Sequence, residues 1–130
     1  MRRLMPAVVV AIVASGVWAL AEEAPGPEGM VCRPVVVVEY HAGPNADRFR
    51  DHVQGHLDHL RAQMKAGNLI YAGPFEEGLG GLSIYVLDDL AEVDKLVSKD
   101  PVVAKKVLTY SMRRWRMCRP DDSQTEDDKG

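Results

Sequence analysis

Residues 32–40 read CRPVVVVEY, and this short stretch decides the fold that the sequence predicts. Its four consecutive valines are branched at Cβ and favour an extended backbone. Because these valines do not alternate with polar residues, both faces of the strand should be covered by other parts of the protein. We therefore expect a strand here, and the segments that follow it define the topology.

The chain after this strand changes repeatedly between helical and extended patterns. Apolar residues recur at intervals of three or four over residues 46–66 and predict a helix. A capping-box pattern predicts a second helix over about residues 90–98, and Asp100-Pro101 opens a further short helical turn. The remaining strands are expected at residues 68–74, 82–87 and 108–118.

The resulting order, β-α-β-β-α-β, is that of an α+β, ferredoxin-like domain, which we expect over residues 32–118. The two helices would cover one face of its sheet. The opposite face would expose valines to water, and a second copy packed face to face would cover them. The sequence therefore predicts a homodimer, a dimeric α+β barrel. The alternative is that polar residues of the other strands suffice on this face.

The two cysteines stand at the two ends of the predicted domain. Cys32 begins the first strand and Cys118 ends the last. In a ferredoxin-like sheet these strands are antiparallel neighbours, so the start of one lies beside the end of the other. We predict a Cys32–Cys118 disulfide, which would stabilise the fold by about 4 kcal/mol in the chain-entropy treatment. Two free thiols are the alternative.

The N-terminal segment has the layout of a secretory signal peptide, expected over residues 1–21. A basic start precedes an uncharged apolar run, and Ala19-Leu20-Ala21 fits the small-x-small pattern before a cleavage point. We expect cleavage, a periplasmic or secreted mature protein and no membrane span in it; an uncleaved anchor is the alternative. A linker is expected over residues 22–31.

The C-terminal segment, residues 119–130, is acidic and poor in apolar residues, and we expect it to be disordered. The whole chain carries a formal net charge of −3 at pH 7. Proteins that bind nucleic acids need a strong basic excess, so no nucleic-acid partner is expected.

Three histidines, His52, His56 and His59, fall on one side of the first predicted helix. A His-x₃-His pair has a spacing that suits zinc, but no Glu or Cys completes a site, so we expect no metal. His56 lies closest to the apolar stripe, between Val53 and Leu60. His52 and His59 should point further towards solvent.

The residues from His56 onward resemble a known family. The pattern His-Leu-x-x-Leu, a helix end at Ala66-Gly67, an apolar strand and Ala72-Gly73-Pro74 are similar to the YCII-related family. Asp100-Pro101-x-Val also fits that family, in which an Asp-Pro pair precedes the short helix before the last strand. The likeness covers about residues 34–117.

The resemblance implies a dimeric barrel with a cleft between sheet and helix, and an acid/base pair that falls by position on His56 and Asp100. A few similar proteins eliminate chloride from chlorinated ring compounds, and relatives on this barrel include muconolactone isomerases and cofactor-free monooxygenases. Histidine titrates near neutrality, and a neighbouring carboxylate would fix its tautomer. Two structural alternatives stay open: Asp100 as a helix cap alone, and His56 as a half-buried histidine bonded to a backbone carbonyl.

Two functions follow. The first is an enzyme of the cell envelope, of lyase or isomerase type and without cofactor, in which His56 and Asp100 act on a small organic acid. Arg114 and Arg116 are candidates to bind this anionic ligand, although an exposed position on an edge strand is the alternative for both. The second function is a non-catalytic module that binds a small ligand or a partner in the cleft.

Overall fold

The computed structural model describes residues 23–122; the expected signal peptide and most of the acidic tail lie outside this range. None of the helices in the described part combines the length and hydrophobicity that crossing a bilayer requires. In chain order the elements are β1 (Ala24–Pro25), β2 (Met30–Ala42), the 3-10 turn η2 (Ala46–Arg48), α2 (Phe49–Lys65), β3 (Leu69–Pro74), β4 (Gly80–Tyr85), α3 (Leu90–Val97), α4 (Pro101–Ala104) and β5 (Leu108–Pro120).

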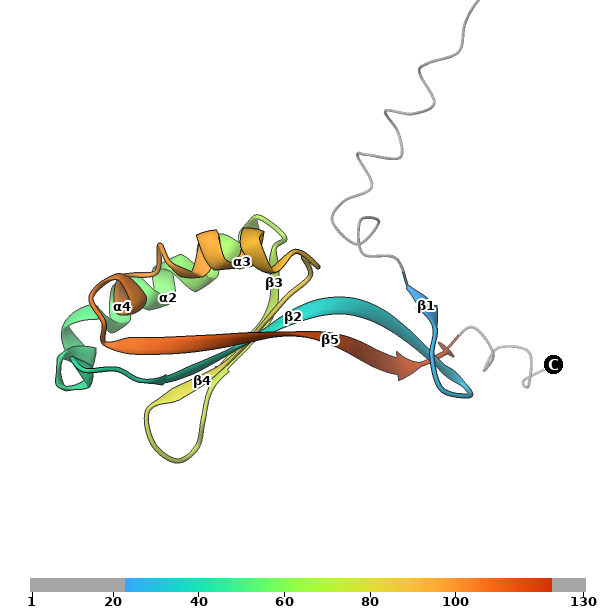
Figure 1. The fold of residues 1–130 in the computed structure, drawn as a ribbon, viewed down its shortest axis with the longest axis horizontal. Coiled ribbons are helices and arrows are strands. Elements are labelled where there is room, and N and C mark those ends of the chain that lie inside the picture. The colour runs from blue at the N-terminus through green and yellow to red at the C-terminus, as the bar shows by residue number, and fades with distance from the viewer. Residues whose placement is uncertain (1–22, 123–130) are drawn as a thin grey trace, which may run out of the picture.

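The four long strands form one antiparallel sheet in the order β3-β4-β2-β5. Figure 1 shows the helices α2, α3 and α4 together in a layer on one face of this sheet. Strand β2 is central, because it pairs with β4 on one side and with β5 along its whole length on the other. The predicted α+β, ferredoxin-like arrangement is therefore confirmed.

The core lies between the helical layer and the sheet. Alternate residues of β2, Val36, Val38 and Tyr40, point into it and are buried, as strand geometry requires. Valines of α3 and α4 pack against them from the other side. On the opposite face of the sheet, the side chains of Tyr71, Leu82 and Trp115 stay exposed. The sheet is thus covered fully on one face only.

The predicted disulfide is present. Cys32 and Cys118 face each other across β2 and β5, with their Cα atoms 4.0 Å apart and their sulfur atoms bonded. The small strand β1 folds back onto the same end of β2, so part of the segment expected to be a linker is extended and paired. Gly26, next to β1, lies so close that a Cβ there would collide with Sγ of Cys32.

Both capping predictions for the short helices agree with the structure. The Asp89 side chain accepts a hydrogen bond from the Ala91 N–H at 2.8 Å and begins α3. Asp100 does the same for α4, through the Val102 N–H at 3.2 Å, with Pro101 in the first helical turn. Aspartate and proline at these positions suit the unpaired N–H groups of a helix start.

Candidate active site

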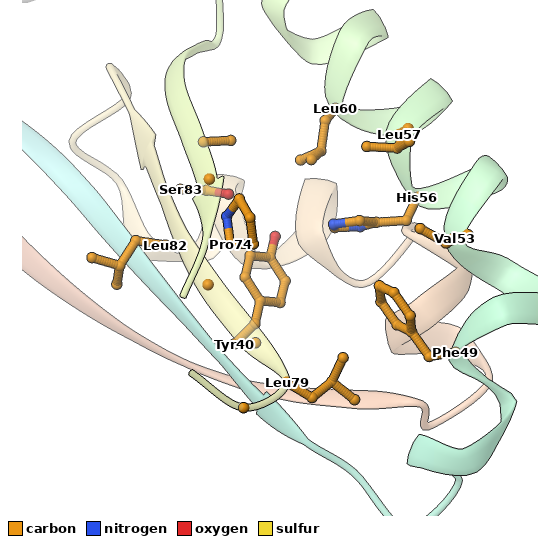
Figure 2. A pocket seen from close by; sticks show the side chains of 15 residues that line it. Tyr40, Phe49, Val53, His56, Leu57, Leu60, Pro74, Leu79, Leu82 and Ser83 are labelled. Carbon is orange, nitrogen blue, oxygen red and sulfur yellow. The ribbon is translucent and has the colours of Figure 1, made fainter. Parts of the chain in front are cut away.

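A cavity of about 450 Å³ lies between helix α2 and the sheet. Figure 2 shows that α2 forms one wall, while β2, β3 and β4 form the other. Most of the lining is apolar, and it includes Phe49, Val53, Leu57, Leu60 and Leu79. Part of the apolar stripe of α2 therefore lines a cavity as well as packing against the core.

His56 is the imidazole that α2 presents to this cavity. Its Nδ1 lies 2.5 Å from Oδ2 of Asp100, and the exposed fractions of the two side chains are 13% and 0%. A charge-assisted hydrogen bond of this length is strong, and burial removes competing water. The structure therefore brings together the two residues that the sequence assigned to an acid/base pair.

Close packing of two helices makes this contact possible. Gly55, one residue before His56, faces Pro101 so closely that a Cβ would lie 3.0 Å from the proline Cγ. The absence of a side chain lets the start of α4 approach α2, and Asp100 begins α4. The glycine thus sets the distance at which the carboxylate meets the imidazole.

Asp100 serves both as a helix cap and as the partner of His56 in this structure. Its Oδ1 accepts the Val102 N–H and caps α4, while its Oδ2 contacts His56. Two interactions fix the orientation of one carboxylate, which is fully buried. A carboxylate that accepts from Nδ1–H leaves the lone pair of the imidazole on Nε2, the atom that can then take a proton from a ligand.

Two tyrosine hydroxyls lie near this pair. The ring of Tyr40 contacts that of His56 edge to face, with centroids 5.8 Å apart. Burial is the largest cause that raises the pKa of Tyr40, and burial likewise raises the pKa of Tyr85 to about 12. Both phenols therefore stay protonated near neutral pH. Tyr40 lines the cavity, whereas Tyr85 lies deeper in the core.

Comparison with known proteins agrees with this picture. Residues 34–116 match the YCII-related domain. The chain belongs to the YCII-related domain family. The resemblance recognised in the sequence is thereby confirmed, and it covers the sheet, the helices and both residues of the pair.

Two similar proteins give this assignment its context. The uncharacterized protein YjpA of Bacillus subtilis is 28% identical over 68 residues, which are 52% of this chain and 80% of YjpA. A solved structure of similar fold is 5-chloro-2-hydroxyhydroquinone dehydrochlorinase (TftG) from Burkholderia phenoliruptrix AC1100, in complex with 2,5-dihydroxybenzoquinone. Its TM-score is 0.51 at 17% identity, over 62% of this chain and 92% of TftG. At this identity the likeness shows the fold alone.

The two arginines selected from the sequence lie elsewhere. Arg114 borders a separate depression beside Asp88 and Asp89, and Arg116 donates to the carbonyl oxygen of Pro25 at 3.4 Å. Neither lines the cavity of His56. Arg114 pairs with Val36 and lies beside the start of α3, away from α2. Arg116 pairs with Pro34, in the part of β5 that continues past the helical layer (Figure 1).

His59 differs from the sequence expectation, because it is not directed into solvent. Its side chain is partly buried, and its Nε2 has no hydrogen-bond partner among the described residues. Burial is the largest cause that lowers its pKa, while Asp100 acts in the opposite direction and His56 and Lys99 add to the lowering. His59 therefore stays neutral near pH 7. Within residues 23–122, no three acidic, histidine or cysteine side chains are arranged to hold a metal ion.

Tyr40 was not among the residues predicted for the site. Its position could be predicted, because Val36, Val38 and Tyr40 alternate along β2 and must share one face of the strand. A tyrosine among valines, however, is most simply interpreted as a core residue.

Proposed function

We propose that this YCII-related protein is an acid/base enzyme of lyase or isomerase type that acts without a cofactor. His56 is the general base and acid, and Asp100 orients it. The observation that carries the proposal is the 2.5 Å contact between His56 Nδ1 and a fully buried Asp100 carboxylate at the wall of an apolar cavity. Clefts that hold a polar, oriented titratable pair are common sites of catalysis.

The pair supports one elementary step. Nε2 of His56 takes the proton from a carbon next to a substrate carbonyl, and the C–H bond breaks. Its electron pair forms a carbon–carbon double bond, and the carbonyl electrons move to the oxygen, which becomes an enolate. Asp100 stabilises the imidazolium that forms. Where a carbon–carbon double bond is conjugated with the enolate, return of the proton to the far carbon completes an isomerisation. Where the β-carbon carries a leaving group, the carbonyl re-forms, the leaving group departs as an anion with the C–X electrons, and the imidazolium gives its proton to water.

The fold neighbour supports this class of chemistry without naming a substrate for this chain. TftG is a dehydrochlorinase, and its complex contains a small oxygen-bearing ring. An elimination by proton transfer uses no cofactor, as the proposal requires. The alternative is a binding module without turnover, which the same cavity would also serve, and the experiment below separates the two.

We also propose that two copies pack together through the open face of the sheet. This face presents Tyr71, Leu82 and Trp115, whose exposed fractions are 65%, 42% and 47%. Exposed aromatic and aliphatic groups of this size favour association in water. The expected product is the homodimeric barrel.

The disulfide supports an oxidising compartment, so we propose that the protein works in the periplasm or outside the cell. Disulfides form and persist in such compartments and are rare in the reducing cytosol. Residues 1–21, which carry the export prediction, lie outside the described range.

Hydrogen–deuterium exchange tests the elementary step without knowledge of the full reaction. Purified protein is incubated in D₂O with a panel of small ketones, unsaturated lactones and chlorinated hydroquinones. Proton NMR measures deuterium uptake next to the carbonyl, and chloride release is measured in parallel. We expect exchange with at least one compound, and His56→Ala should reduce its rate about 10²- to 10⁴-fold, the usual contribution of general acid/base catalysis.

His52→Ala is the matched control. It removes the same side chain from the same helix, one turn away, at a position that does not line the cavity. It should leave the exchange rate unchanged. Tight binding of a panel compound without exchange or chloride release would instead support the binding module, and equal losses in the two variants would overturn the role of His56.

A further inference from the structure

The cavity has a second polar feature, on the wall opposite His56. The hydroxyls of Tyr40 on β2 and Ser83 on β4 both border it, and the exposed fractions of these residues are 3% and 1%. Figure 2 shows the Tyr40 hydroxyl directed into the space between the sheet and the imidazole of α2. The proposed base is on one wall, and a phenol faces it from the other.

The Tyr40 hydroxyl lacks a well-formed hydrogen bond among the described residues. The hydroxyls of Ser83 and Tyr85 lie close enough to interact with it and to influence its pKa, but neither contact has ordinary hydrogen-bond geometry. Leaving a buried hydroxyl unpaired costs about 1–3 kcal/mol, so natural proteins rarely keep one without reason. A ligand oxygen in the cavity would supply the missing acceptor.

The surroundings restrict the charge of that ligand. Among the described residues that line the cavity, none is a lysine or an arginine, and the lining is mostly apolar. A carboxylate held here would lose its hydration without gaining a permanent cation, which is costly. An uncharged carbonyl or phenol loses much less, and a protonated tyrosine offers it one well-placed donor.

We propose that Tyr40 donates a hydrogen bond to the carbonyl or phenolic oxygen of an uncharged, largely apolar substrate held between Tyr40 and His56. The catalytic part of this inference rests on the proposed function. When His56 takes the carbon-bound proton, the charge develops on the oxygen that Tyr40 contacts, so this donor stabilises the enolate more than the ketone. The substrate is then a neutral ring ketone or phenol, in place of the organic acid expected from Arg114 and Arg116.

Three isosteric probes test the inference by binding alone. Acetophenone carries a carbonyl, α-methylstyrene replaces that oxygen by CH₂, and benzoate replaces the methyl ketone by a carboxylate. Dissociation constants are measured by calorimetry or by ligand NMR for the wild type and for Tyr40→Phe. Tyr40→Phe should weaken acetophenone about tenfold, within the range for one hydrogen bond, and change α-methylstyrene less than twofold. The wild type should bind benzoate more weakly than acetophenone.

Tyr110→Phe is the matched control, because it removes the same hydroxyl from a tyrosine that does not line the cavity and whose hydroxyl donates to Asp94. It should leave all three dissociation constants unchanged. The carbonyl stretching band of bound acetophenone gives a second readout: the wild type should shift it to lower frequency, and Tyr40→Phe should abolish that shift.

Several outcomes overturn the inference. These are failure of the wild type to bind acetophenone, equal losses for acetophenone and α-methylstyrene in Tyr40→Phe, or tighter binding of benzoate. The proposed function fails separately. If no panel compound exchanges but Tyr40→Phe still weakens acetophenone, the protein binds the ligand as proposed but is not the proposed enzyme. If exchange depends on His56 but Tyr40→Phe has no effect on binding, the role of Tyr40 is wrong and the proposed function stands.

Discussion

Strand β2 passes through two different environments along its length. From Val36 to Tyr40 it lies under the helical layer, where it contacts the core and the cavity (Figure 1). From Met30 to Pro34 it extends past the helices and is held by β1, by β5 and by the Cys32–Cys118 disulfide. The half under the helices is stabilised by packing against the helical layer, and the other half by strand pairing and a covalent bond.

This difference explains where chemistry can take place. A site needs side chains that converge on a volume from two layers, and only the helix-covered half of β2 provides them. The uncovered half has the surface pair Arg119–Glu23, with nitrogen and oxygen 2.9 Å apart, but no opposing layer. We therefore expect changes in the two halves to have separable effects on stability and on the site.

The largest expected effect on stability comes from the uncovered half. The double change Cys32→Ser with Cys118→Ser should lower the free energy of unfolding by about 2–5 kcal/mol, because it removes the constraint on an 86-residue loop of the unfolded chain. Denaturant unfolding measures this loss. Dissociation constants for acetophenone at a temperature where the variant is folded should stay at the wild-type value; a large change would mean that the two halves are coupled.

The second effect separates the two roles of Asp100. Asparagine at this position still caps a helix but carries no charge, whereas alanine can neither cap the helix nor carry a charge. Asp100→Ala should therefore unfold about 1 kcal/mol more easily than Asp100→Asn, the usual value of one N-cap. Both variants should lose proton-exchange activity about 10²-fold or more. Equal stability of the two variants would mean that the hydrogen bond from the Val102 N–H to the side chain at position 100 contributes nothing to the free energy of unfolding.

The site and the disulfide were predictable to different degrees, for physical reasons. The cysteine pairing followed from strand order alone, since antiparallel neighbours fix which ends meet. The approach of Asp100 to His56 depended on helix packing and was assigned from the family resemblance. The place of Arg114 and Arg116 could not be predicted, because the sequence does not show where the helical layer ends. Tyr40 was missed because burial in a valine-rich strand masks a functional hydroxyl.

The third effect concerns the packing of α4 on α2. Gly55→Ala places a Cβ about 3.0 Å from Pro101, closer than ordinary contact, so α4 must move slightly away. Alanine also favours the helix by about 1 kcal/mol, so the change in unfolding free energy should be small. Proton exchange should nevertheless fall several-fold, because the His56–Asp100 contact lengthens. Gly55→Ala with unchanged activity and higher stability would show that this packing does not set the site.

The smallest effect is expected from His59, and it depends on pH. Burial holds the pKa of His59 below its ordinary value of 6.5 in the folded state. The unfolded chain therefore binds more protons as pH falls below about 6.5, and the folded state loses stability over that range. His59→Gln should reduce the loss of stability between pH 7 and pH 5. His52→Gln serves as the comparison, since it makes the same change two turns away on the same helix.

The same measurement sharpens the contrast between the two halves. His59 lies in the helix-covered half, where Asp100, His56 and Lys99 are the titratable groups that act on it. The disulfide has no titrating group in this range, so the cysteine double variant should keep the wild-type pH dependence at a lower overall stability. If His59→Gln left the pH dependence unchanged and the cysteine variant altered it, the acid sensitivity would arise in the uncovered half instead.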